Sequence, residues 1–219
     1  MKNIGILTLG LKHNYGGILQ ATALYNFLNN EGYVPLLIRK YPIQNSFKFL
    51  ILRVLEIIPF QNLKGLRNAH IKYKNNINFL NYYMPNQTKV FKYKTEIEEY
   101  LKENSIDYLI VGSDQVWRYS YINDSEYDTY FLNFNIAKKI KKISYAASFG
   151  IDRWEEPSKN LDVKKYLSDF NAISVRETSG KLICKENFEI ENVQIVLDPT
   201  FLVNKSFYLD MIKDSRKTF

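Results

Sequence analysis

Hydrophobic residues along the chain occur either in short continuous runs or with the spacing of a helix, and the pattern changes from segment to segment. A largely apolar run at Lys2–Leu9 predicts a buried strand, and the pair Gly16–Gly17 separates it from apolar positions with helical spacing. This helical spacing begins at Leu19 and is expected to end at Gly32, after which Val34–Tyr41 predicts a second strand. Strand, helix and strand in this order predict a βαβ unit with a right-handed crossover between parallel strands.

Helices and strands continue to alternate in the rest of the chain. Thr95 and Glu98 fit a capping box for a helix at 96–105. Beyond it, the pattern predicts strands at 107–112 and 141–150, a helix followed by a strand over 160–177, a short helix at 179–188 and a last strand at 193–200. Strands separated by helices predict an α/β fold with a doubly wound, mainly parallel, Rossmann-like sheet, whose ligands bind beyond the carboxyl ends of the strands.

The segment Ile43–Lys94 differs from its surroundings because it is rich in Asn, Lys, Tyr and Phe. Its apolar spacing predicts helices at about Phe47–Ile58 and Leu63–Tyr82. We interpret this segment as a helical insertion into the α/β domain.

The composition excludes several classes of protein and site. A chain of 219 residues, 46% of them hydrophobic, can bury a proper core. One cysteine, Cys184, cannot form an intramolecular disulfide, and with only His13 and His70 besides, we expect no metal site. No apolar run is long enough for a spanning helix and no secretory signal is visible, so we expect a cytoplasmic protein.

The net charge of +7 is concentrated in Lys64–Lys94 and Lys138–Lys142. Lysines interleaved with tyrosines could neutralise and stack on nucleic acid. A solvated, lysine-rich surface around two helices is the simpler interpretation, because no recognition motif accompanies it. We therefore expect no nucleic-acid partner.

Five polar clusters each follow a predicted strand directly: "HNYGG", "GSDQVWR", "SFGIDRW", "VRE" and "LDPT". The carboxyl ends of parallel strands share one edge of the sheet, so these clusters are expected to converge there. Turns would also occupy these positions in a protein without a site, but without such uniform use of Asn, Gln, Ser, Asp, Arg and Trp.

In the first cluster, Gly16 and Gly17 would let the backbone approach a ligand. The N–H groups that open the following helix favour a phosphate or a carboxylate. The loop matches neither the dinucleotide-binding glycine pattern nor a Walker loop, and a tight turn also needs a glycine, so both interpretations stay open. Gln20 lies one helical turn further and could face the loop.

In the second cluster, Ser113, Asp114, Gln115, Trp117 and Arg118 combine an acid, an amide, an aromatic ring and a cation. This combination suits sugar recognition. Asp114 could accept a proton from a hydroxyl or could merely cap the following turn. Trp117 could equally belong to the core, as aromatic residues usually do.

In the remaining clusters, Arg176 and Glu177 could form an internal ion pair, or Arg176 could bind a carboxylate or phosphate, which its place at a strand end favours. Asp198 before a proline most simply fixes a turn. Neither Ser148 nor Cys184 has a histidine nearby in sequence, so a nucleophilic triad is not indicated.

Five segments, in this order and with ordinary spacing, resemble the polysaccharide pyruvyl transferase family. They are "NYGGILQATAL", "DYLIVGSDQVW", "YFLNF" with "KKISYAASFG", "AISVRE" and "VLDPTFL". The resemblance covers nearly the whole chain, and "VGSDQVW" with "SYAASFG" is its most specific pair.

The resemblance implies an enzyme similar in fold to the two-domain GT-B glycosyltransferases. Such an enzyme moves a pyruvyl group from phosphoenolpyruvate to a sugar of a cell-surface polysaccharide as a cyclic ketal, with no cofactor. By the resemblance, the loop Asn14–Gly17 lines the interdomain cleft, Asp114 lies on the acceptor side and Arg176 helps to hold the donor. Some family members carry an acidic residue where this chain has Gly17.

The family implies a second domain that would begin near the end of this chain. We therefore expect residues 1–203 to form the N-terminal domain, with the insertion at about 43–94, and residues 204–219 to begin a linker to a domain that is missing or supplied separately. The clusters and the resemblance together predict Asp114 and Arg176 as catalytic residues. The predicted substrate-binding residues are Asn14, Tyr15, Gly16, Gly17, Gln20, Ser113, Gln115, Trp117, Arg118, Ser148, Phe149, Gly150 and Glu177.

Two other functions remain open at this point: a glycosyltransferase domain of the same fold that uses a nucleotide sugar, and a non-catalytic glycan-binding fragment. The acceptor could be lipid-linked, in which case Phe49–Phe60 could contact the inner face of the membrane. An ordinary buried helix is the simpler interpretation of that segment.

Overall fold

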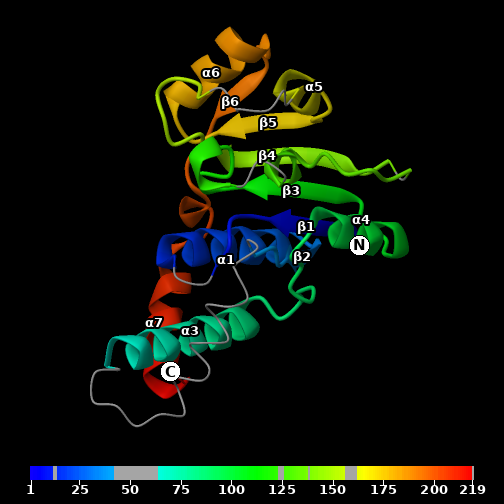
Figure 1. The fold of residues 1–219 in the computed structure, drawn as a ribbon. Coiled ribbons are helices and arrows are strands. Elements are labelled where there is room, and N and C mark those ends of the chain that lie inside the picture. Colours follow the sequence, from blue (N-terminus) through cyan, green and yellow to red (C-terminus); the bar gives the residue numbers. More distant parts are fainter. Residues whose placement is uncertain (12–13, 42–63, 123–125, 138, 156–161, 219) are drawn as a thin grey trace.

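A computed structural model gives the fold of residues 1–11, 14–41, 64–122, 126–137, 139–155 and 162–218 (Figure 1). Of residues 64–73 and 214–218 only the backbone is described. The expected helix at Phe47–Ile58 and the apolar segment Phe49–Phe60 lie outside these ranges. Within them, no helix has both the length and the apolar character that crossing a bilayer requires.

Six strands form one sheet in the order β2-β1-β3-β4-β5-β6, and every neighbouring pair is parallel (Figure 1). The strands are β1 (Asn3–Leu7), β2 (Val34–Ile38), β3 (Tyr108–Gly112), β4 (Lys141–Ala147), β5 (Ala172–Val175) and β6 (Val193–Ile195). The strand order changes direction between β1 and β3. Ligands of doubly wound sheets bind at the carboxyl side of this point.

Helices cover both faces of the sheet. In the part of the chain that the structure describes, the α-helices are α1 (Tyr15–Asn30), α3 (Lys64–Tyr83), α4 (Lys94–Glu103), α5 (Val163–Ser168), α6 (Thr178–Phe188) and α7 (Lys205–Thr218). Short 3-10 helices are η2 (Tyr119–Tyr121), η3 (Tyr127–Phe131) and η4 (Pro199–Phe201).

Alternate residues of the strands belong to two separate hydrophobic clusters, one on each face of the sheet. Ile4 and Ile6 of β1 pack with residues of α1 and α3 on one face, whereas Leu7 packs in the cluster that includes α4, α5 and α6 on the other. Successive strand residues point to opposite faces, which explains why the strands are apolar at nearly every position. The predicted doubly wound α/β fold is confirmed.

Within the described residues, the predicted elements are present, with changed ends. The helix expected at Leu63–Tyr82 is α3, Lys64–Tyr83. The last strand, expected over 193–200, ends at Ile195, because Asp198 and Pro199 already begin η4. The residues expected to begin a linker form helix α7, and Met211 of this helix is buried.

The capping box predicted for α4 was wrong in its residues. Glu96, rather than Glu98, accepts hydrogen bonds from the backbone N–H groups of Lys92 and Tyr93, at 2.6 and 2.9 Å. Thr95 therefore lies inside the helix. Glu98 instead accepts a hydrogen bond from the backbone of Asn135 at 2.8 Å, which fixes the loop before β4.

The described part of the insertion packs against the edge of the domain. Leu80 and Met84, at the end of α3, are buried in the α1 cluster. The chain then follows the outer side of β2, where Gln87 and Phe91 form isolated bridges with Leu37 and Lys40. The insertion thus covers what would otherwise be a free sheet edge.

Candidate functional site

The polar clusters that follow the strands do converge on one edge of the sheet. Hydrogen bonds and ion pairs join side chains that follow β1, β3, β4, β5 and β6. We call this group of side chains the rim; it consists of Asn14, Ser113, Asp114, Ser148, Arg176, Glu177 and Asp198.

At the first strand end, Asn14 caps α1 and also reaches the second cluster. Its Oδ1 atom accepts a hydrogen bond from the Gly17 backbone N–H at 2.9 Å, and its Nδ2 atom donates to Asp114 Oδ2 at 2.8 Å. A Cβ atom on Gly17 would lie 2.9 Å from Asn14 Nδ2 and 3.2 Å from Asp114 Oδ2. Glycine is therefore required for this contact, whereas Tyr15 and Gly16 are exposed to solvent and open to a ligand.

Asp114 is a half-buried carboxylate held on both oxygens. Its Oδ1 atom accepts a hydrogen bond from the backbone N–H of Gln115 at 2.8 Å, and Asn14 holds Oδ2. Burial raises the pKa of Asp114 above its usual value, and the hydrogen bond from Gln115 and the charge of Arg176 offset this only in part. A carboxylate that is more basic than usual and reaches the rim is suited to accept a proton.

Gln20 supports the rim from beneath. It is 2% exposed, its Oε1 atom accepts a hydrogen bond from the Ser113 backbone N–H at 2.9 Å, and its Nε2 atom donates to Thr8 Oγ1 at 3.2 Å. These bonds join α1 to the ends of β1 and β3. The side chain does not face the opening loop, so its predicted contact with substrate is replaced by an internal one.

Gln115, Arg118 and Gly150 lie together beside the rim. Arg118 Nη1 donates to Gln115 Oε1 at 3.0 Å and to the Tyr121 hydroxyl at 3.2 Å, and the guanidinium lies 4.5 Å from the Tyr121 ring centroid. A Cβ atom on Gly150 would lie 2.5 Å from Gln115 Cδ. Tyr121, which is 58% exposed, supplies the accessible aromatic ring of this cluster and was not foreseen from the sequence.

Trp117 and Phe149 belong to the core, which corrects their predicted role in substrate binding. Both are fully buried. The Trp117 indole donates to the Tyr130 carbonyl at 3.0 Å and stacks on Phe131, with ring centroids 5.4 Å apart. The alternative interpretation of Trp117 as a core residue is the one that the structure supports.

Ser148 and Glu177 link the ends of β4 and β5. The Ser148 hydroxyl is hydrogen-bonded to Glu177 Oε1, and it also accepts from the Gly150 backbone N–H at 2.9 Å. Glu177 Oε2 lies 3.7 Å from Arg176 Nε, so the internal ion pair considered from the sequence is present. Ser148 is only 1% exposed, so its hydroxyl serves this network rather than a ligand in solution.

Asp198 is a rim residue that sequence reasoning treated only as a turn. The turn is confirmed, because Oδ1 accepts hydrogen bonds from Thr200 N at 3.0 Å and Thr200 Oγ1 at 2.8 Å. The other oxygen, Oδ2, accepts from Ser113 Oγ at 3.1 Å and Arg176 Nη1 at 3.3 Å. Burial alone would raise the pKa of Asp198, but the hydrogen bonds from Thr200, Ser113 and Arg176 outweigh it and lower the pKa. Asp198 directly follows a predicted strand, as the other polar clusters do, and this position was the sequence feature that could have indicated its place in the rim.

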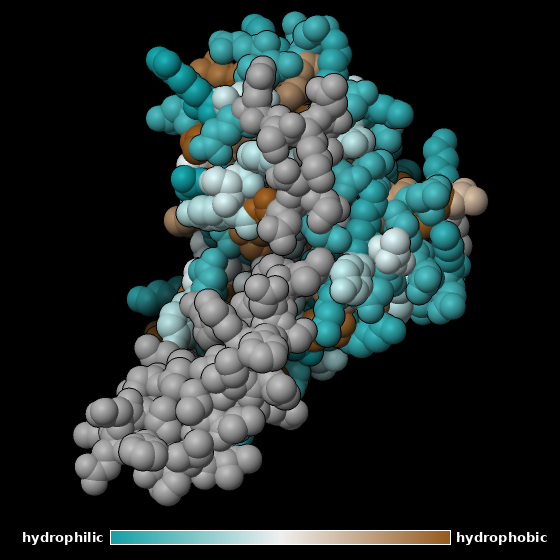
Figure 2. Space-filling view, viewed as in Figure 1, coloured by the Kyte–Doolittle hydropathy of each residue, from teal (hydrophilic) through white to brown (hydrophobic). Residues whose placement is uncertain are grey.

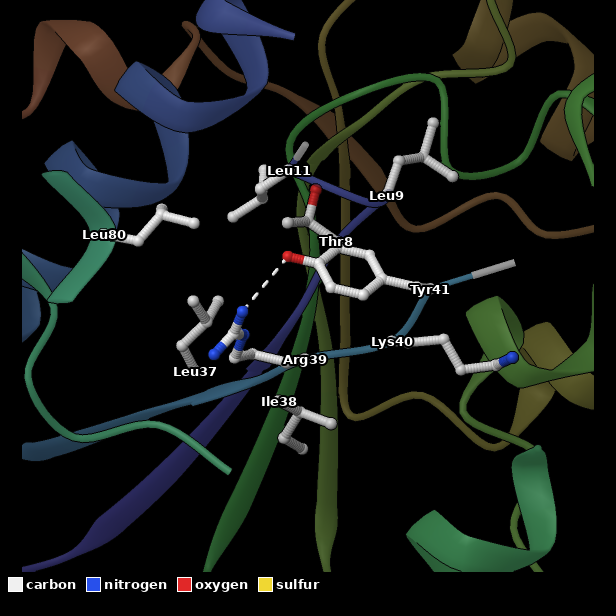
Figure 3. Close-up of a pocket in the computed structure, with 9 residues that line it drawn as sticks. All are labelled: Thr8, Leu9, Leu11, Leu37, Ile38, Arg39, Lys40, Tyr41 and Leu80. Carbon is white, nitrogen blue, oxygen red and sulfur yellow. Dashed lines mark hydrogen bonds between the residues drawn. The ribbon is translucent and has the colours of Figure 1, made fainter. Parts of the chain in front are cut away.

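A small pocket lies at the carboxyl ends of β1 and β2 (Figure 3). Its volume of about 10 Å³ holds no more than about one water molecule. Figure 3 shows Arg39 pointing into it, with Nη2 donating to the Tyr41 hydroxyl at 3.4 Å, while Lys40 points away. Lys40 is buried and pairs with Glu126 at 2.8 Å. The pocket is too small for a sugar or for phosphoenolpyruvate.

The described residues contain no group of three or more His, Cys, Asp and Glu side chains that could hold a metal ion. Burial raises the pKa of the Cys184 thiol to about 12, so it is not a reactive nucleophile. The face seen in Figure 2 is mostly hydrophilic where it is described, and its apolar residues are scattered.

The family model described as polysaccharide pyruvyl transferase matches residues 14–219. No curated protein and no solved structure matches the chain. The matched region covers nearly the whole chain and includes every residue of the rim. The chain therefore belongs to the polysaccharide pyruvyl transferase family.

Proposed function

We propose that this chain acts in the transfer of a pyruvyl group from phosphoenolpyruvate to a sugar of a cell-surface polysaccharide, which becomes a cyclic ketal. The rim is the proposed reaction site, with Asp114 as the proton acceptor and Arg176 as a ligand of the donor's anionic groups. The observation that carries the proposal is Asp114, whose basicity is raised and whose two oxygens are held by Asn14 and Gln115.

The reaction that we propose has a simple balance of atoms. One sugar hydroxyl adds to C2 of the enol phosphate and loses its proton, while C3 gains a proton and becomes a methyl group. The C2–O bond to phosphate then breaks, and a second hydroxyl of the same sugar adds to C2 with loss of its proton. One ketal and one inorganic phosphate result, and Asp114 would receive the proton from an attacking hydroxyl.

The charges of the rim favour the sugar side of this reaction. Arg176 faces Asp198 and Glu177, at 3.3 and 3.7 Å, and Asp114 adds a third carboxylate close by. One guanidinium among three carboxylates suits hydroxyl groups better than a donor with several negative charges. We therefore propose that the acceptor sugar binds mainly at the carboxylates of this rim, that Arg176 supplies one cationic group of the donor site, and that further cationic groups complete that site.

The proposal is tested by incubating the purified chain with phosphoenolpyruvate and a panel of β-linked galactose and N-acetylmannosamine acceptors. Released phosphate and pyruvylated sugar are measured for the natural chain, Asp114→Asn and Asp169→Asn. Asp169 is a matched control, because its side chain is 57% exposed and pairs with Lys142 at the opposite end of the sheet. We expect Asp114→Asn to lower the rate by roughly 10²–10⁴-fold and Asp169→Asn to leave it unchanged.

Two further arms separate the alternatives. Acceptor binding without turnover, followed by saturation-transfer NMR, would support a glycan-binding half of a larger enzyme. Turnover of a nucleotide sugar in place of phosphoenolpyruvate would support a glycosyltransferase instead. We place the reaction in the cytoplasm, in keeping with a lone, buried cysteine.

A further inference from the structure

We propose that Asp198 is the positioning residue of this site, holding Arg176 and the end of β3 in one arrangement over the edge of the sheet. The inference rests on the proposed role of Arg176 toward the donor. It adds to that role a residue whose side chain acts through another and touches no substrate itself.

The first argument is the path of the chain. β3 and β6 are separated in the sheet by β4 and β5, so their ends lie roughly 14 Å apart at the usual strand spacing. Nevertheless, the Asp198 carboxylate, which follows β6, lies 3.1 Å from the Ser113 hydroxyl, which follows β3. Figure 1 shows how this occurs: after β6 the chain crosses the ends of the neighbouring strands and reaches α1, where η4 packs.

The second argument is that the two carboxylate oxygens of Asp198 accept hydrogen bonds from different partners. Oδ1 accepts both hydrogen bonds from Thr200, and these fix the plane of the carboxylate. Oδ2 is thereby aimed at Ser113 and Arg176. A carboxylate that only capped the turn would need the first pair of bonds alone.

The third argument is the orientation of the guanidinium. Asp198 binds Nη1 of Arg176, and Glu177 lies beside Nε, so two of its three nitrogen atoms face carboxylates. The Arg176 side chain keeps 36% of its surface exposed. A planar guanidinium with carboxylates at both Nη1 and Nε presents the N–H groups of Nη2 in a fixed direction, which is what binding a carboxylate or a phosphate requires.

The fourth argument is that Asp198 stays ionised. The hydrogen bonds it accepts lower its pKa despite partial burial. At neutral pH it therefore presents a full negative charge to Arg176, and without that charge the long arginine side chain would regain several rotamers.

The test uses Asp198→Asn, which keeps the shape of the side chain. The amide oxygen can still accept both bonds from Thr200, so the turn is retained, whereas an amide Nδ2 facing Arg176 Nη1 sets donor against donor. We expect the KM for phosphoenolpyruvate to rise about tenfold while the KM for the acceptor stays unchanged. Thr200→Val removes one bond to Oδ1 only, and it should alter the donor KM less than Asp198→Asn does.

A second readout does not depend on turnover. The Arg176 side-chain Nε–Hε signal, assigned through loss in Arg176→Lys, should be sharp in the natural chain and in Asp169→Asn, and should shift and broaden in Asp198→Asn. An unchanged signal would overturn the positioning role. So would an unchanged donor KM or tighter donor binding in an active Asp198→Asn, since tighter binding would mean that Asp198 competes with the donor. If the natural chain neither binds nor turns over phosphoenolpyruvate, the role of Arg176 toward the donor fails, while the arginine signal still decides whether Asp198 holds Arg176 in place.

Discussion

Asn14 and Asp114 lie a hundred positions apart in the chain, and the Nδ2 atom of the first donates to the Oδ2 atom of the second at 2.8 Å. The same asparagine caps α1 through its Oδ1 atom. One short side chain thus joins the helix that follows β1 to the loop that follows β3, at the point where the strand order changes direction. Its two tasks can be separated by mutation.

Asn14→Ser keeps the helix cap, because serine caps helices about as well as asparagine, but its hydroxyl cannot also reach Asp114. We expect the free energy of unfolding to change by less than about 0.5 kcal/mol, while turnover falls. Asn14→Ala should lose both functions and destabilise the fold by about 1 kcal/mol. Urea denaturation and the phosphate-release assay measure the two effects, and equal loss of stability in both variants would contradict this division.

The activity should depend on pH through Asp114. Its pKa is raised in the folded chain, mainly by burial, so the deprotonated base is lost at a higher pH than for an ordinary aspartate. The acid limb of a kcat/KM profile should therefore lie above the usual value of 3.8. In Asp114→Asn that limb should disappear from the residual activity, whereas Asp169→Asn should retain it; an acid limb in Asp114→Asn would assign it to another group.

The stability should depend on pH through Asp198 with the opposite sign. Its pKa is lowered in the folded chain, so its ionised form stabilises the fold above the unfolded pKa of about 3.9. That contribution is lost as the pH falls through the lower, folded pKa. The natural chain should thus be more stable than Asp198→Asn at pH 7, and the difference should shrink in acid. Urea midpoints for both chains at several pH values measure this, and a difference that is constant with pH would rule it out.

Gly112 ends β3 with a φ of +132°, and a Cβ atom there would lie 2.1 Å from the Tyr145 carbonyl oxygen. We expect Gly112→Ala to destabilise the fold by about 3 kcal/mol or more, because two strands at the rim must separate. Gly32→Ala is the matched control. Its φ is +82°, but no atom lies within 4 Å of the added Cβ, so it should cost only about 1–2 kcal/mol. Thermal unfolding of both variants tests the difference, and similar losses would show that the close contact is unimportant.

Gln20 should contribute to stability through the hydrogen bond that it accepts from the Ser113 backbone. Gln20→Met fills similar space but leaves that buried N–H without a partner, which should cost about 1–3 kcal/mol. Asn29→Met, on an exposed position of the same helix, should change the stability by less than about 0.5 kcal/mol. If both variants unfold at the same urea concentration, water or another group must replace the lost bond.

The sequence by itself determined the layers and order of this fold. The apolar run at Lys2–Leu9 specifies a strand that is buried on both faces. The helical spacing of apolar residues that follows, the glycine that ends it and the next apolar run specify a helix and a second strand. The clusters of polar residues after the strands could also be placed at one edge, because parallel strands end on the same side. The family followed from the same segments, and the matching family model agrees.

Only the tertiary structure decided which of those polar residues face solvent and which face each other. Trp117 belongs to the same polar cluster as Asp114, and Gln20 lies one helical turn beyond the first cluster, yet both are buried. The bonds from Asp198 to Ser113 and Arg176 depend on a chain path that crosses strand ends, which no local pattern encodes. The local spacing of hydrophobic residues determines where helices and strands form, whereas long-range contacts depend on how the whole chain packs.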